Sequence, residues 1–178
     1  MTDANALPRV RDGLGAMLPR LRRFARSLTG DPHDADDLVQ VAIEKALQRH
    51  AQWDPAQALE GWVFGILRNA WIDTVRARRE TVEFDAEAAE TMAGEDGRTT
   101  AEARLHLAEV RRAMAGLPEE QRSVLMLVCV EGMRYREVAA ALDIPEGTVM
   151  SRLSRARLAL ADRLKDKALG VQQQGIRR

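Results

Sequence analysis

A short turn between two helical patterns constrains the fold of this chain more than any other feature. Residues 135–142 carry apolar side chains at helical spacing. Residues 148–164 do the same, with a narrow stripe made of Val149, Leu153, Ala156, Leu160 and Leu164. Between them, residues 143–147 read DIPEG, a composition typical of a tight turn. Two helices joined by a short turn that contains glycine predict a helix-turn-helix.

The second of these helices has a polar and basic outer face. Opposite its apolar stripe lie Ser151 and Arg155, flanked by Met150, Arg152, Ser154 and Arg157. In a helix-turn-helix the second helix enters the major groove of DNA, where arginine side chains read base edges. The pattern therefore indicates a DNA-binding module at this end of the chain.

Net charge divides the chain into segments. Its 178 residues suffice for one ordinary domain or two small ones, and its 27 basic and 27 acidic residues cancel. Residues 1–82 sum to +1, residues 83–102 to −6 and residues 103–178 to +5. Because residues 83–102 also lack apolar periodicity, they are predicted to be a flexible acidic linker. The predicted fold class is all-α: two small helical domains, 1–82 and 103–170, joined by that linker and followed by a tail at 171–178.

Three or four helices are predicted in the N-terminal domain. Pro19 is expected to open the first, which runs to Leu28, and Asp31-Pro32 to start the second as N-cap and first helical residue. The third is predicted over residues 59–79. Its inward face is expected to consist of Trp62, Val63, Ile66, Leu67, Ala70 and Trp71. Its opposite arc holds Arg68, Asn69, Arg76 and Arg79. Phe64 lies off the apolar stripe, so both core packing and base stacking remain open for it.

In the C-terminal domain, helices are predicted over residues 101–115 and from Pro118 onward. The second contains the apolar run 124–130, in which Cys129 is expected to be buried and inert.

One Cys and three His residues exclude a disulfide framework and leave no metal-ligand spacing, so no metal or cofactor is expected. No catalytic motif stands out either. Because the chain lacks a secretory signal and an apolar stretch of about 20 residues, a cytoplasmic protein without membrane insertion is expected.

Four stretches resemble the bacterial RNA polymerase sigma factors of the extracytoplasmic-function group. They are DPHDADDLVQVAIEKAL (31–47), GWVFGILRNAWIDTVR (61–76), GLPEEQRSVLMLVCVEGMRYREVAAAL (116–142) and GTVMSRLSRARLAL (147–160). Their order is also that of the family, with a module for core binding and promoter melting followed by a helix-turn-helix module. The resemblance implies a subunit that binds core RNA polymerase and promoter DNA, without a catalytic site of its own.

The resemblance also implies roles for individual residues. In the family the Asp-rich helix docks on the polymerase, which assigns core binding to Asp36, Asp37 and Gln40. Val41 departs from the acidic residue that is usual after this Gln. Asn69 matches the position that captures a flipped base of the minus-ten element, with Arg68, Arg76 and Arg79 beside it. The minus-thirty-five element is then read by the start of the last helix, at Thr148, Met150, Ser151, Arg152, Ser154 and Arg155. Met150 and Ser154 depart from the bulkier or basic residues often found there.

A DNA-binding regulator that acts without polymerase is the alternative. Its helix-turn-helix would look the same, but it would not need the N-terminal domain and would usually dimerise to read a two-fold site. The family resemblance further implies an anti-sigma protein as a partner. Binding to core polymerase separates the two hypotheses.

Overall fold

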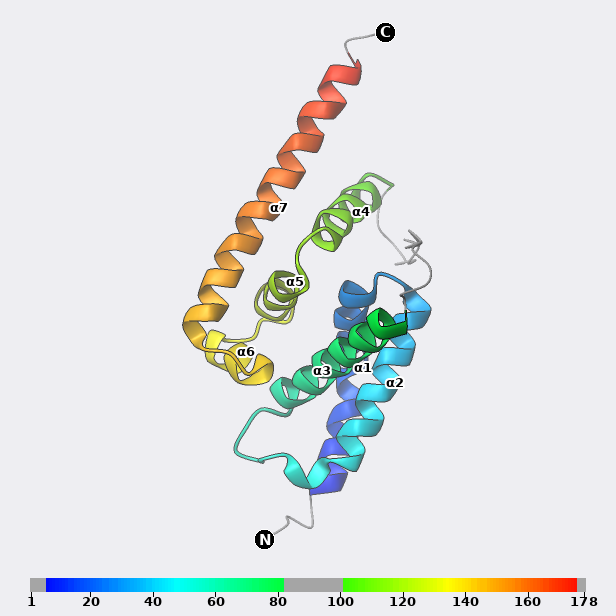
Figure 1. The fold of residues 1–178 in the computed structure, drawn as a ribbon, viewed down its shortest axis with the longest axis vertical. Helices are drawn as coiled ribbons and strands as arrows, with labels where there is room; N and C mark the ends of the chain where they lie inside the picture. Colours follow the sequence, from blue (N-terminus) through cyan, green and yellow to red (C-terminus); the bar gives the residue numbers. More distant parts are fainter. Residues whose placement is uncertain (1–5, 82–100, 176–178) are drawn as a thin grey trace.

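The computed structural model describes residues 6–81 and 101–175, with side chains described for 6–78 and 105–165. Within these residues the chain is helical and has no strand, which confirms the all-α class (Figure 1). The elements in order are α1 (Ala6–Thr29), α2 (Pro32–Gln48), η1 (His50–Gln52), α3 (Leu59–Thr81), α4 (Ala101–Ala115), α5 (Glu119–Leu125), η2 (Met126–Val130), α6 (Tyr135–Leu142) and α7 (Glu146–Gly175). The acidic segment expected as a linker falls almost entirely on residues 82–100, outside the described residues.

Helix α1 is longer than the sequence suggested. It starts at Ala6 and runs through Pro19, so the expectation that Pro19 opens this helix is wrong. Proline costs a helix interior about 3 kcal/mol because it lacks an N–H donor. Burial of one continuous stripe offsets that cost, since Val10, Leu14, Met17, Leu21, Phe24 and Leu28 are all buried. The packing of α1 against the rest of the fold therefore outweighs the tendency of Pro19 to interrupt the helix.

Helices α2 and α3 complete the N-terminal module. Asp31 caps α2 by accepting hydrogen bonds from the backbone N–H groups of His33 and Asp34, as predicted from the Asp-Pro pair. In α3, Phe64 is fully buried and meets the ring of Phe24 edge-on, with centroids 5.3 Å apart. Phe64 is therefore a core residue and not a base-stacking platform.

The apolar run 124–130 forms the end of α5 and a π-helical turn, η2. Its signature is the hydrogen bond from the N–H of Glu131 to the carbonyl of Met126, five residues earlier. Within this turn Leu127 is buried, while Cys129 and Val130 near its end are exposed. The prediction that Cys129 is buried is wrong, because an unbroken apolar run does not show which side of its last turn other helices cover.

Buried apolar side chains from both modules form one continuous cluster, from Val10 of α1 to Ala156 of α7. Figure 1 shows α6 lying at the N-terminal end of α3, while α7 projects as a long rod away from the N-terminal helices. In the part of the chain that the structure describes, no helix combines the length and the apolar character needed to cross a membrane.

Candidate functional site

Helices α6 and α7 form the predicted helix-turn-helix. Helix α6 ends at Asp143, whose φ of 52° places it in the left-handed region. The N–H of Ile144 donates a hydrogen bond to the carbonyl oxygen of Ala139. Val149, Leu153 and Ala156 pack inward, as the sequence predicted. Helix α7 begins at Glu146, two residues before the expected start at Thr148. This geometry leaves the other side of the first turns of α7 exposed.

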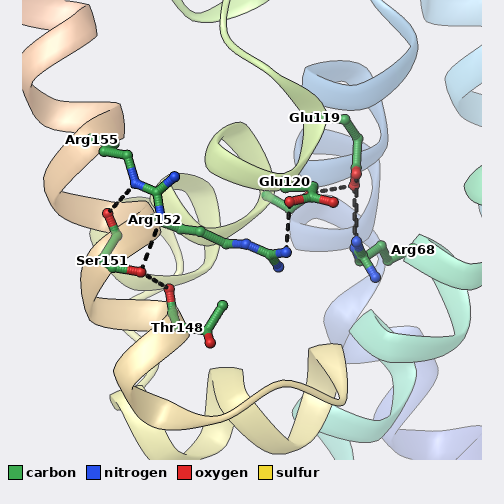
Figure 2. Close-up of polar contacts among 8 residues, drawn as sticks. Arg68, Glu119, Glu120, Thr148, Ser151, Arg152 and Arg155 are labelled. Atoms are coloured by element: carbon green, nitrogen blue, oxygen red, sulfur yellow. Dashed lines mark hydrogen bonds and ion pairs between the residues drawn. The ribbon is translucent and has the colours of Figure 1, made fainter.

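The exposed face of α7 carries most of the predicted minus-thirty-five residues. Met150, Ser151, Ser154 and Arg155 are all exposed there, while Thr148 is half-buried. The guanidinium of Arg155 donates to Ser151 twice: Nη2 to the hydroxyl and Nε to the carbonyl oxygen, each at 3.3 Å (Figure 2). These bonds fix the arginine along the helix while its remaining N–H groups stay available to a ligand.

Arg152 does not join that face. Its guanidinium turns back to α5 and forms an ion pair of 2.6 Å with the carboxylate of Glu120, which leaves 18% of the Arg152 side chain exposed (Figure 2). The sequence pattern placed Arg152 beside the outer face because helical spacing does not show where a long side chain finds a partner. The ion pair of Arg152 with Glu120 therefore links α7 to α5.

The residues expected at the minus-ten element are only partly brought together. Asn69 and Arg76 are exposed on α3, and the side chain of Arg79 lies outside the described residues. Arg68 is 12% exposed and contacts the carboxylate of Glu119 at 3.2 Å, across the boundary between the modules. Asn69 and Arg76 are therefore accessible to a ligand, whereas Arg68 forms an ion pair with Glu119 of the same chain.

The acidic face of α2 is open to solvent. Asp36, Asp37 and Gln40 are all exposed, and Val41 beside them is 41% exposed. Asp36 is 3.0 Å from Arg22 of α1, and Gln40 donates to Glu44. Asp37 has no ion-pair partner among the described residues, so its charge remains uncompensated there.

Three carboxylates were missed by the sequence reasoning: Glu119, Glu120 and Glu131. Acidic residues in the first turn of a helix are favoured by the helix dipole regardless of function, so Glu119 and Glu120 gave no separate signal. Glu131 contacts Arg20 and Arg23, more than a hundred residues earlier in the chain. Within the described residues, no group of three His, Cys, Asp or Glu side chains is arranged to hold a metal ion.

Two family models match this chain, one over each module. Sigma-70 region 2 matches residues 14–81, and Sigma-70, region 4 matches residues 107–160. The region 2 match favours the sigma factor over the stand-alone regulator, which would need no such module.

Relatives and solved structures agree with these matches. The ECF RNA polymerase sigma factor EcfG of Rhodopseudomonas palustris is 40% identical over 153 residues, which cover 85% of this chain and 83% of the relative. SigF of Caulobacter vibrioides is 32% identical over 156 residues, 87% of this chain and 85% of the relative.

Among solved structures, the sigma factor RpoE in complex with the anti-sigma factor NepR from Bartonella quintana superposes with a TM-score of 0.78. It is 33% identical and covers 87% of this chain and 96% of that one. CnrH in complex with the cytosolic domain of CnrY has a TM-score of 0.65 at 28% identity, over 92% and 94% of the two chains. The chain therefore belongs to the ECF RNA polymerase sigma factors, non-catalytic subunits that bind core RNA polymerase and direct it to promoters for transcription initiation.

Proposed function

We propose that three exposed faces of the chain have separate roles in promoter recognition. The acidic face of α2 binds core polymerase, the exposed arc of α3 takes the minus-ten element, and the outer face of α7 reads the minus-thirty-five element. The boundaries proposed for the two domains are 1–82 and 103–170, with the acidic segment 83–102 as the linker and 171–178 as the tail. The observation that carries the proposal is the exposed face of α7, where Arg155 is held in place by Ser151.

The chemistry of the α7 face suits the major groove. Arginine donates to the O6 and N7 atoms of guanine, and serine hydroxyls can donate or accept at other base edges. Met150 is 55% exposed in the middle of this polar face and can contact the methyl group of thymine. The ion pair of Arg152 with Glu120 supports a different role for Arg152, which is to hold α7 at a fixed orientation on α5.

Core binding should depend on the uncompensated carboxylate of α2. Replacing Asp37 by lysine should lower the affinity for core polymerase by at least about ten-fold, because a charge reversal in an interface adds repulsion to the lost attraction. The fold should persist, since the side chain is exposed and lies away from the buried stripe. Fluorescence anisotropy of the labelled chain titrated with core polymerase measures the effect.

The control is the same charge reversal at Asp162, an exposed residue of α7. Asp162→Lys should leave core affinity within about two-fold of the unchanged chain, because surface substitutions away from an interface have small effects. Equal core affinity for the Asp37 and Asp162 variants would remove α2 from the proposed polymerase interface.

Strand opening should depend on Asn69. Its exposed amide can satisfy the Watson–Crick edge of an extruded base, which otherwise loses a few kcal/mol of stacking and pairing. Asn69→Ala should therefore leave closed-complex formation unchanged and slow promoter opening by about ten-fold. Permanganate footprinting over time on one mapped promoter measures opening, and a mobility-shift assay at low temperature measures the closed complex. Opening at the unchanged rate would refute base capture by Asn69.

An anti-sigma protein and a cytoplasmic site of action are part of the same proposal. The similar structures of RpoE and CnrH are complexes, the first with an anti-sigma factor by name. An anti-sigma protein is therefore the partner proposed for this chain besides core polymerase and promoter DNA. RNA polymerase works in the cytoplasm, so the chain is expected to act there.

A further inference from the structure

The guanidinium of Arg155 is attached to the helix that carries it. Its two hydrogen bonds to Ser151, one to the hydroxyl and one to the carbonyl oxygen, hold it along the surface of α7. To follow a base edge by changing rotamer, the arginine would have to break those bonds. The position that the guanidinium reaches in the major groove therefore depends on the rotation of α7 about its own axis.

A small rotation of α7 is enough to affect base contacts. Side-chain atoms of a helix lie about 6 Å from its axis, so a rotation of about 10° moves them by about 1 Å. The distances from a nitrogen donor to an oxygen acceptor fall within about 2.7–3.2 Å. A displacement of about 1 Å therefore breaks a hydrogen bond to a base edge.

The buried stripe of α7 determines which side of the helix faces the core. Val149, Leu153 and Ala156 are at most 3% exposed. Hydrophobic contact is non-directional, so a small rotation keeps such side chains buried. A directional contact is needed to fix the rotation of α7 more closely.

Arg152 supplies a directional contact. Residues 152 and 157 lie about 140° apart around the helix axis, one on each flank of the stripe. The guanidinium of Arg152 forms an ion pair of 2.6 Å with Glu120, in the first turn of α5 (Figure 2). On the other flank Arg157 donates to the sulfur of Cys129 at 3.5 Å, and a thiol is a weak acceptor. The ion pair is therefore the stronger of these two restraints.

The ion pair also makes Arg152 a poor ligand for DNA. Its side chain is 18% exposed, and a carboxylate at contact distance balances its charge. A phosphate that approached this guanidinium would be repelled by the same carboxylate. Glu120 and Arg152 can therefore affect the reading of DNA through the helix they hold.

We propose that Glu120 and Arg152 are positioning residues for promoter specificity: their ion pair sets the rotation of α7, and thereby the base edges that Arg155 reaches. This inference rests on the proposed reading of the minus-thirty-five element by α7 and extends it to a residue of another helix. Glu120 is 56% exposed, and exposed ion pairs add little to stability. Loss of the pair should therefore lower promoter discrimination and leave folding almost unchanged.

Discrimination is measured with the polymerase holoenzyme on one mapped promoter. It is the ratio of the affinity for that promoter to the affinity for duplexes with single-base changes in the minus-thirty-five element. Glu120→Gln and Arg152→Gln should each lower this ratio by about three- to ten-fold. The double variant should lower it no further, because each single change already breaks the same pair. Unfolding midpoints should stay close to that of the unchanged chain.

Exchange of the two charges tests whether the pair itself is responsible. Glu120→Arg combined with Arg152→Glu forms an ion pair in the reverse sense and should restore most of the discrimination that either substitution loses alone. Glu146→Gln is the control, since it removes the same charge from an exposed position in the first turn of α7. It should change the affinity for all duplexes alike and leave discrimination unchanged.

The salt dependence of binding separates a positioning residue from a phosphate contact. Loss of an arginine that contacts phosphate lowers the slope of log affinity against log salt concentration by about one. Arg152→Gln should leave this slope unchanged. A fall of about one, or full discrimination by the Glu120→Gln variant, would overturn the proposal.

Arg155→Ala in the same assay keeps this result apart from the proposed function. If the Arg155 variant also discriminates fully, that side chain does not read the minus-thirty-five element, and the proposed function fails together with the positioning pair. A loss of discrimination confined to the Arg155 variant refutes the positioning pair alone.

Discussion

Replacing Arg155 by alanine should weaken binding to the minus-thirty-five element by about 1–3 kcal/mol and relax its sequence preference. The side chain is exposed on the outer face of α7 and is oriented by two hydrogen bonds to Ser151, so a base edge meets an arginine that is already in position. The measurement is competition between the cognate duplex and single-base variants for the polymerase holoenzyme.

Arg163→Ala is the matched control, because it removes the same charge from the same helix. Arg163 donates to the carbonyl oxygen of Gly116 and lies two turns beyond Arg155. It should change affinity for all duplexes alike or leave it unchanged. If the Arg155 variant keeps the full discrimination between bases, that side chain does not read the element.

Phe64→Ala should destabilise the N-terminal module by about 3–5 kcal/mol, the usual cost of removing a buried aromatic ring. The ring is fully buried, meets Phe24 edge-on and lies 5.6 Å from the guanidinium of Arg20. Phe64→Leu should cost less than about 1.5 kcal/mol, because the replacement stays apolar and keeps most of the volume.

Urea unfolding followed by tryptophan fluorescence measures the effect, with probes that all lie in this module. All three tryptophans of the chain, Trp53, Trp62 and Trp71, belong to it. Equal unfolding midpoints for the alanine and leucine variants would mean that Phe64 is not part of a tightly packed core.

Much of the fold could be predicted because its signals are local. Asp31 and Pro32 start α2 through a cap and a fixed backbone angle, which depend only on neighbouring residues. The stripe of Val149, Leu153 and Ala156 is buried as its spacing predicted, because every α-helix places residues that are three or four positions apart on one side. The exposed positions of Asn69 and Arg155 follow from the same periodicity.

Other features depend on surfaces that meet only in the folded chain. Helix α1 passes through Pro19 because packing of its buried stripe outweighs a local penalty. Cys129 is exposed near the end of a π-helical turn, although it belongs to an apolar run, because no other helix in the part of the chain that the structure describes covers that side of the turn.

The pairing of arginines was likewise decided by tertiary structure. The sequence placed Arg68 and Arg152 on outward arcs by their spacing, yet each turns to a carboxylate of α5. Arg68 and Glu119 are 51 residues apart, and Arg20 and Glu131 are 111 apart. Periodicity determines which side of a helix a residue occupies. Which partner a long charged side chain finds depends on how two helices dock, and only the tertiary structure decides that.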